Sequence, residues 1–140
     1  MSHKVESPRL WRVVDLAKDH EELSCWWTAR GWAPIAPEML PESGWMAVNE
    51  AGQPLAAIWA YNATGVPLAM IEFLVTNPDA RIGEVVQGIE RVIALAVEYC
   101  RITKTKAIFT TCKQPSLVRL YERNGFFQTD TGVTHLLHKF

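Results

Sequence analysis

Residues 83–101 have the most regular helical pattern of the chain, and this helix constrains the fold more than any other feature. Charged and amide side chains occupy one face, and the opposite face is formed by Val85, Ile89, Val92, Ile93, Ala96 and Cys100. The helix lies between two strand-like apolar runs, residues 68–76 and 107–111. Two strands joined through a long helix run parallel in one sheet. The sequence therefore predicts a mixed sheet whose parallel pair borders a usable cleft.

Shorter patterns predict the remaining elements. Further strands are expected at residues 10–14, 44–48, 54–62, 126–129 and 133–138. A first helix is expected to be capped by Asp19, with Glu22 three positions later, and a last helix to begin at Pro115. Residues 31–43 are punctuated by prolines and predict a long loop. Together these elements predict a single α+β domain, residues 1–140, with a twisted, mostly antiparallel mixed sheet of about seven strands flanked by helices.

Composition excludes several classes of protein. The 140 residues are 49% hydrophobic, enough to fill one core, and a formal net charge of −1 without a basic tract argues against electrostatically driven nucleic-acid binding. No apolar run approaches the roughly 20 residues of a membrane-spanning helix, and the N-terminus lacks the apolar core of a signal peptide. Cys25, Cys100 and Cys112 lack metal-ligand spacing, and His135 and His138 lie on opposite faces of an expected strand. We therefore expect a cytoplasmic protein with reduced thiols and no bound metal.

Residues 114–126 predict a helix that ends at a glycine and carries one tyrosine where a site could use it. Pro115 suits the first turn, and Asn124-Gly125 offers the left-handed residue that ends a helix. This stretch resembles the C-terminal signature of the GCN5-related N-acetyltransferase (GNAT) superfamily, roughly N-x-x-A-x-x-L-Y-E-K-x-G-F before a strand. The residues that follow the signature are Leu120, Tyr121, Glu122, Arg123, Gly125 and Phe126, and those that differ are Gln114 and Leu117. The expected order of elements is also similar to that family across nearly the whole chain.

The resemblance implies direct transfer of an acetyl group from acetyl-CoA to an amine. Tyr121 would then be the general acid that protonates the leaving thiolate, and Glu72, among apolar neighbours of an expected strand, is the candidate general base. A strand N–H near Leu74 or Val75 would polarise the thioester carbonyl. In the family the cofactor enters where the two parallel strands splay apart. From the residues alone, Tyr121 could instead be a core tyrosine at a helix end, and Glu72 a solvent-facing residue of the sheet.

The loop after this strand differs from the family's pyrophosphate-binding loop, R/Q-x-x-G-x-G/A, which binds through backbone N–H groups and a helix N-terminus. In one alignment Ala80 takes the first place, Gly83 matches and Val85 replaces the last glycine. In the other, Arg81 takes the first place and both glycines are lost. Arg81 and Gly83 would form a partial anion site with the free amides of the first turn, whereas the Glu84 carboxylate would stabilise the same helix N-terminus. The expected acetyl-CoA contacts are Leu74, Val75, Arg81, Ile82, Gly83, Glu84, Val85 and Gln114.

Two interpretations of the function remain open. As an enzyme, the protein would acetylate a small-molecule or peptide amine that is held by variable loops, here residues 31–43 and the turn near Ala63. As a non-catalytic binding, inhibitory or assembly module, it would have lost acyl-CoA binding and would use its tryptophan-rich N-terminal half.

The expectations about binding partners are based on the tryptophans and on the predicted terminal strands. Trp26, Trp27, Trp32, Trp45 and Trp59 either pack in the core or line an acceptor groove. Trp26 and Trp27 point about 100° apart on one helix, so both are buried only if the loop after Gly31 covers one of them, and we expect one to meet an acceptor or a partner. The terminal strands could pair across a homodimer.

Overall fold

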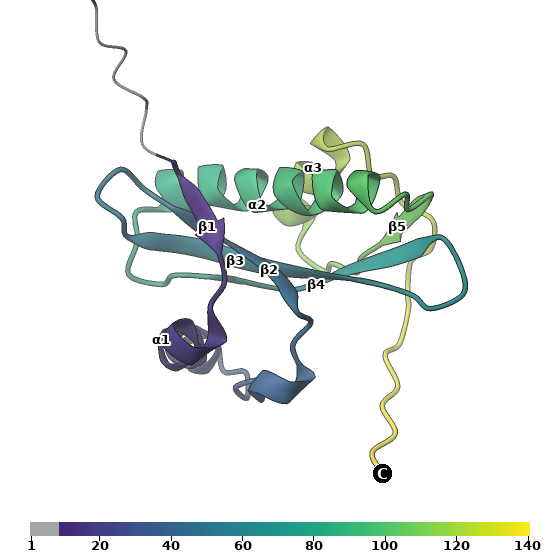
Figure 1. Ribbon diagram of the computed structural model, residues 1–140, viewed down its shortest axis with the longest axis horizontal. Helices are drawn as coiled ribbons and strands as arrows, with labels where there is room; N and C mark the ends of the chain where they lie inside the picture. Colours follow the sequence, from purple (N-terminus) through teal and green to yellow (C-terminus); the bar gives the residue numbers. More distant parts are fainter. Residues whose placement is uncertain (1–8) are drawn as a thin grey trace, which may run out of the picture.

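The computed structural model describes residues 9–140, which form a single sheet with helices on both faces (Figure 1). The strands are β1 (Trp11–Val13), β2 (Ser43–Val48), β3 (Pro54–Asn62), β4 (Leu68–Thr76) and β5 (Ala107–Phe109). The helices are α1 (Leu16–Ala29), the 3-10 turn η1 (Pro37–Met39), α2 (Ile82–Ile102) and α3 (Pro115–Arg123). Within residues 9–140 the strand order is β1-β2-β3-β4-β5, antiparallel except for the parallel pair of β4 and β5. The predicted α+β class, the mixed sheet and its parallel pair are confirmed.

The sheet separates two apolar clusters. α2 and α3 cover one face, where Ile58 and Ile71 are buried, and α1 covers the other, where Trp59 and Val75 are buried (Figure 1). The central strand β3 is apolar on both faces because it lies between these two layers, and residues 55–60 are all buried.

The long helix α2 approaches the sheet closely at one glycine. A Cβ atom on Gly88 would lie 3.0 Å from Leu55 Cβ and 3.3 Å from Ala47 Cβ, so the absence of a side chain lets α2 cross β2 and β3 at short range. The predicted helix at residues 83–101 is confirmed, with one further residue at each end.

Both tryptophans of α1 are buried, and the expectation that one of them meets an acceptor or partner is wrong. Trp26 and Trp27 are each 2% exposed, in the cluster that also contains Leu40 and Ile35 of the loop after α1. The loop supplies the cover that this burial requires, and it confirms the alternative of core packing for these two side chains.

The start of α1 differs from the prediction. Asp15 is the N-cap, with extended backbone and a side chain that accepts a hydrogen bond from the Ala17 N–H at 3.2 Å. Asp19 lies one turn inside the helix, where its carboxylate accepts hydrogen bonds from the two terminal nitrogens of Arg12 at 2.7 and 2.8 Å and from the Asp15 N–H at 2.8 Å. The capping box with Glu22 is therefore wrong, because Asp19 is used to join α1 to β1.

Replacing Asp19 by alanine is expected to lower the free energy of unfolding by about 1–3 kcal/mol, since Arg12 and the Asp15 N–H lose their acceptor. Burial alone would raise the pKa of Asp19, but the hydrogen bonds from Arg12 and Asp15 outweigh it and hold the pKa below its ordinary value of 3.8. The stabilisation is therefore complete above that ordinary value and is lost as the pH falls through the lower pKa of the folded state. Denaturant unfolding at several pH values measures the effect.

Lys18→Ala is the matched control for the Asp19 variant, because the Lys18–Asp15 pair is exposed and its atoms are 4.0 Å apart. We expect it to change stability by less than about 0.5 kcal/mol. Equal stabilities of the wild type and the Asp19 variant at neutral pH would contradict the role given to the Arg12–Asp19 pair.

The two C-terminal strands predicted at residues 126–129 and 133–138 are absent from the described structure, and the predicted strand at 107–111 is shortened to Ala107–Phe109. Residues 127–140 are all exposed, so their side chains have no sheet face on which to pack. A strand also needs a neighbour for its backbone hydrogen bonds, and this segment pairs with no strand in residues 9–140. The sheet therefore has five strands in that part of the chain, fewer than the number expected.

Candidate active site

The parallel strands β4 and β5 separate after a short stretch of pairing. Their register joins Leu68 to Ala107, Ala69 to Ile108 and Met70 to Phe109, after which β5 ends while β4 continues to Thr76. From residue 71 onward, the edge of β4 that faces away from β3 therefore has no strand beside it among residues 9–140. The splayed pair that the resemblance implied is confirmed.

A β-bulge interrupts β4 directly beside this unpaired edge. Glu72 lies opposite Trp59 and Val75 opposite Ala57, so two residues of β4 face the single residue Ile58. Phe73 in the bulge has φ of 63°, a left-handed conformation that is uncommon for a large side chain. Such strained backbone is frequent at functional sites.

Tyr121 lies in the last turn of α3 and is 4% exposed. Its ring packs edge-on against Phe126 at a centroid distance of 5.2 Å. Burial raises the pKa of Tyr121 to about 12, opposed by a side-chain hydrogen bond with Thr110 and assisted by the charges of Cys112 and Glu72. Because Thr110 directly follows β5, the phenol lies beside the point where β4 and β5 separate, and it is protonated at neutral pH.

The raised pKa of Tyr121 makes stability depend on pH in alkaline solution. The folded state keeps a proton that the unfolded state loses above the ordinary pKa of 10.0, so stability is complete below pH 10 and falls as the pH rises to about 12. A shift of two pKa units corresponds to a loss of about 2–3 kcal/mol in the free energy of unfolding. We expect the Tyr121→Phe variant to lack this loss, so the difference in unfolding free energy between the wild type and the variant should change from pH 9 to 12. A constant difference across that range would contradict the raised pKa of Tyr121.

Glu72 is half-buried at the middle of β4, on the face of the sheet that α1 covers, as its pairing with Trp59 requires. Burial raises the pKa of Tyr61 on the neighbouring strand, and the charge of Glu72 raises it further. The same carboxylate contributes to the raised pKa of Tyr121. Tyr121 belongs to the apolar cluster on the other face, beneath α2 and α3, so the sheet lies between the two predicted catalytic side chains, and the charge of Glu72 is a small contributor to the pKa of the phenol.

The N-terminus of α2 is open. Arg81 is the N-cap residue, without a side-chain hydrogen bond to the helix, and the first intrahelical bond runs from the Val85 N–H to the Arg81 carbonyl at 3.0 Å. The N–H groups of residues 82–84 therefore lack intrahelical partners. A Cβ atom added to Gly83 would meet nothing within 4 Å. This geometry leaves room for an anion to approach the backbone.

The other residues expected at the cofactor loop take different positions. Val85 is a buried residue of α2, whereas Ile82 and Gln114 are exposed. The Glu84 carboxylate accepts a hydrogen bond from Asn49 Nδ2 at 3.3 Å, in the turn between β2 and β3. Of the two expected carbonyl-binding positions, Leu74 packs toward the α2 side and Val75 toward the α1 side. The structure thus places these residues at the C-terminal half of β4 and at the start of the helices that follow.

Three contributors to this site were not singled out from the sequence. Phe73 forms the bulge, Thr110 is the hydrogen-bond partner of Tyr121, and Asn77 fixes the loop before α2. Asn77 donates from Nδ2 to the Pro54 carbonyl at 2.8 Å and accepts from the Asp79 N–H at 2.9 Å. The Asn-Pro-Asp sequence of this loop was the one available signal, since asparagine commonly bonds to the backbone two residues on.

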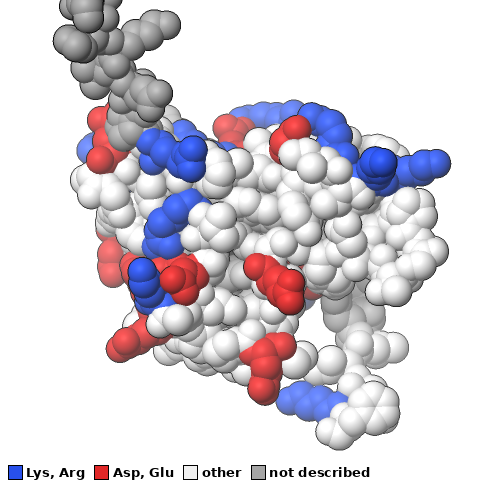
Figure 2. Space-filling view, viewed as in Figure 1, with Lys and Arg blue, Asp and Glu red and all other residues white. Residues whose placement is uncertain are grey.

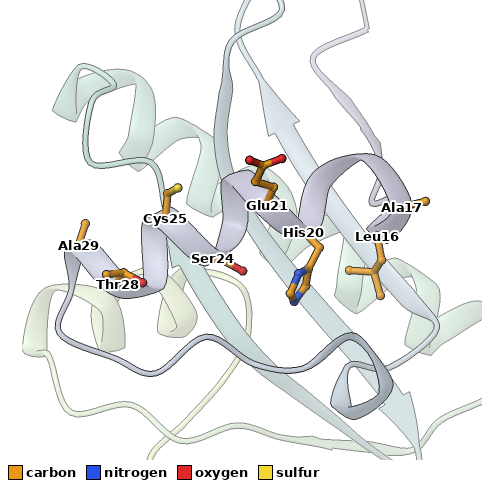
Figure 3. A pocket seen from close by; sticks show the side chains of 8 residues that line it. All are labelled: Leu16, Ala17, His20, Glu21, Ser24, Cys25, Thr28 and Ala29. Atoms are coloured by element: carbon orange, nitrogen blue, oxygen red, sulfur yellow. The ribbon is translucent and has the colours of Figure 1, made fainter.

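A hollow of about 850 Å³ runs along α1 and lies outside the candidate site. The side chains that line it, among them His20, Cys25 and Thr28, all belong to α1 (Figure 3). His20 Nε2 lies 2.7 Å from the Ile35 carbonyl oxygen and so links α1 to the loop that follows it. Neither Tyr121 nor Glu72 lines this hollow.

Charged side chains of both signs are scattered over the face in Figure 2, and much of that face is formed by uncharged residues. Among residues 9–140, no three histidine, cysteine or carboxylate side chains are grouped so that they could hold a metal ion. No helix in that range is both long and apolar enough to cross a bilayer.

Comparisons with known proteins identify the fold. No family model and no curated protein sequence matches the chain. Among solved structures, a protein from Agrobacterium tumefaciens named as an acetyltransferase is 19% identical, with 91% of this chain and 99% of that chain covered and a TM-score of 0.69. The GNAT superfamily phosphinothricin acetyltransferase from Sinorhizobium meliloti, solved in complex with acetyl-CoA, is 16% identical, with 89% and 80% covered and a TM-score of 0.69.

The same architecture occurs in a protein with a different name. A transcriptional regulator from Bacillus halodurans is 16% identical, with 93% of this chain and 98% of that chain covered and a TM-score of 0.59. At these identities the likeness establishes the fold, and the function has to be argued from the site.

Proposed function

We propose that this chain, which has the GNAT fold, is an acyl-CoA-dependent N-acyltransferase. It would move an acetyl group from acetyl-CoA to the amine of a small molecule or peptide. The observation that carries the proposal is the buried, protonated Tyr121 beside the point where β4 and β5 separate. A tyrosine that only filled the core would not need to lie at the one edge where β4 has lost its neighbour. The fold shared with an acetyltransferase solved with acetyl-CoA supports the same assignment.

In the proposed reaction the amine nitrogen attacks the thioester carbonyl carbon and forms the new C–N bond. The backbone N–H groups at the bulge, near Leu74 and Val75, stabilise the oxyanion. The C–S bond then breaks, and Tyr121 gives its proton to the leaving thiolate. Glu72 accepts the proton that the attacking nitrogen releases, and proton exchange with water restores both groups. No metal takes part in this sequence.

The N-terminus of α2 is the proposed site for the cofactor pyrophosphate. Free backbone N–H groups, the open space at Gly83 and the exposed Arg81 all suit an anion. The hydrogen bond from Asn49 holds Glu84 toward the β2–β3 turn, so this carboxylate has a partner other than the helix N-terminus. Val85 points into the core, so a valine at this position does not block the approach of a phosphate.

Calorimetric titration with acetyl-CoA tests the proposal. We expect saturable binding that Arg81→Ala weakens by about 10- to 100-fold, because a charge-assisted hydrogen bond to phosphate is lost. Arg101→Ala is the matched control, since it removes the same charge at the other end of α2 and should leave the affinity unchanged. An absence of binding at millimolar acetyl-CoA would overturn the proposal.

A non-catalytic module is the second candidate, and the altered loop before α2 favours it. That loop has only one of the two small residues of the family's pattern, and the Bacillus halodurans regulator has the same fold. Under this alternative the protein binds a partner without acetyl-CoA. An unchanged thermal midpoint at millimolar acetyl-CoA would support it, because a bound ligand at 100 times its dissociation constant adds about 2.7 kcal/mol of stability.

A further inference from the structure

The side chain of Arg30 reaches from one face of the sheet to the other. Arg30 is the C-cap residue of α1, which covers the face where Trp59 and Val75 are buried, opposite α2 (Figure 1). Its guanidinium nevertheless donates a hydrogen bond to the hydroxyl oxygen of Thr76, the last residue of β4. Thr76 pairs with Ala56, which belongs to the apolar cluster beneath α2, so its hydroxyl lies on the α2 face. The Arg30 side chain therefore passes around the C-terminal part of β4.

That part of β4 is the one without a neighbouring strand. β5 pairs with β4 only as far as Met70, and in the described part of the chain nothing continues the sheet beyond it on that side. The Arg30 guanidinium thus lies at the C-terminal end of the same unpaired edge along which the proposed function places the acyl-CoA.

This end of β4 leads directly into the open N-terminus of α2. The connection is a tight turn, in which the Ala80 N–H donates to the Asn77 carbonyl at 3.4 Å. The Cα atoms of the first and last residues of such a turn lie within about 7 Å of each other. Thr76 and Arg81 directly flank this turn. Arg30, which is bound to Thr76, therefore lies at the same end of the site as Arg81 and the free N–H groups of α2.

Arg30 is exposed, and its guanidinium has donors to spare. Within residues 9–140 it forms no ion pair, whereas Arg12, Arg101 and Arg123 each pair with a carboxylate. A guanidinium has five N–H donors, and the neutral hydroxyl of Thr76 accepts from only one of its nitrogens. A planar cation with free donors, beside a backbone anion site, suits a phosphate group, which it can bind through two parallel hydrogen bonds.

We propose that Arg30 is a second cationic ligand of the acyl-CoA pyrophosphate, contributed by α1 around the unpaired part of β4. This inference rests on the proposed function, which places the pyrophosphate at the N-terminus of α2. On binding, the guanidinium exchanges the Thr76 hydroxyl for phosphate oxygens, and the charge-assisted hydrogen bonds are stronger than the neutral one. The second cation compensates for a loop that has only one of the two small residues of the family's pattern.

Calorimetric titration of Arg30→Ala with acetyl-CoA tests this role. We expect an affinity about 10-fold lower than that of the wild type, because a charge-assisted contact to phosphate is lost. Arg30→Lys should have an intermediate affinity, since lysine keeps the charge but not the two parallel donors. Lys18→Ala is the matched control, because it removes a positive charge from the same helix about 18 Å away, and it should bind as the wild type does. An Arg30→Ala variant with wild-type affinity would overturn the proposal.

A substitution of Thr76 separates phosphate binding from a merely structural link between α1 and β4. Thr76→Val removes the hydroxyl that accepts from Arg30 and keeps the shape of the side chain. We expect it to retain the affinity for acetyl-CoA within about threefold, because the guanidinium leaves this hydroxyl when phosphate binds. Equal losses of affinity for Thr76→Val and Arg30→Ala would overturn the proposal.

A second donor identifies the phosphate group that Arg30 contacts. Acetyl-dephospho-CoA keeps the pyrophosphate but lacks the phosphate on the ribose. Arg30→Ala should lower the affinity for this donor by the same factor as for acetyl-CoA. A loss confined to acetyl-CoA would assign Arg30 to the ribose phosphate and would overturn its role at the pyrophosphate.

The same titrations distinguish a failure of this inference from a failure of the proposed function. If the wild type binds acetyl-CoA and only Arg81→Ala weakens the binding, the proposed function stands and the role of Arg30 is wrong. If the wild type does not bind acetyl-CoA, both are wrong.

Discussion

Replacing Tyr121 by phenylalanine is expected to lower kcat for acetyl transfer by about 10²–10⁴-fold, the usual contribution of a positioned general acid. The phenol is buried and its pKa is about 12, so it holds its proton throughout the neutral range and can give it to a thiolate. The change leaves the ring, and its packing against Phe126, in place. The KM for acetyl-CoA should change little, because the hydroxyl acts on the reacting sulfur and not on the pyrophosphate. Release of the free thiol of CoA, with an amine found by screening, gives the rate.

Tyr99→Phe is the matched control for that variant. Tyr99 is a half-buried tyrosine of α2, whose ring lies 5.2 Å from that of Trp45. It should retain the wild-type rate while losing the same hydroxyl group. A Tyr121 variant whose kcat falls by less than about threefold, with acetyl-CoA still bound, would show that the hydroxyl serves stability alone and would remove it from the mechanism.

The parts of the fold that the sequence predicts well are those where one local pattern and one burial requirement agree. The sheet covers the apolar face of α2 along its whole length, so the apolar residues that recur at helical spacing are also the ones that pack on the sheet. β3 is an uninterrupted apolar run because both its faces are covered. Gly125 ends α3 with φ of 91°, as its position after Asn124 predicts. From these elements the parallel pair of β4 and β5 could be predicted.

The parts that could not be predicted depend on contacts between distant residues. Asp15 and Asp19 are both suitable cap residues, and the choice is made by Arg12, which pairs with Asp19. Phe73 adopts a left-handed conformation that no local preference of phenylalanine favours, so the bulge follows from the pairing of β4 with β3. The C-terminal strands were predicted from composition, but strand formation needs a neighbouring edge that composition does not reveal.

Replacing Trp59 by alanine is expected to lower the free energy of unfolding by about 3–5 kcal/mol, the usual cost of emptying a site filled by a large aromatic side chain. Trp59 is 1% exposed, lies at the centre of the sheet and stacks on Trp27 at a centroid distance of 6.1 Å. The matched control is Trp32→Ala, because Trp32 is half exposed in the loop after α1, and we expect it to change stability by less than about 1 kcal/mol. Equal losses for the two variants would contradict a core role for Trp59.

The indole of Trp59 also explains why residue 44 on the neighbouring strand is glycine. A Cβ atom at Gly44 would lie 2.5 Å from both Cδ1 and Nε1 of Trp59, closer than two atoms can approach. Gly44→Ala should therefore destabilise the wild type by about 1–3 kcal/mol through overpacking. In a Trp59→Ala background the indole is absent, so the same substitution should have much less effect. Denaturant unfolding of the wild type, the two single variants and the double variant measures the coupling between the two positions. Strictly additive losses would show that residue 44 must be glycine because of its backbone conformation and not because of the indole of Trp59.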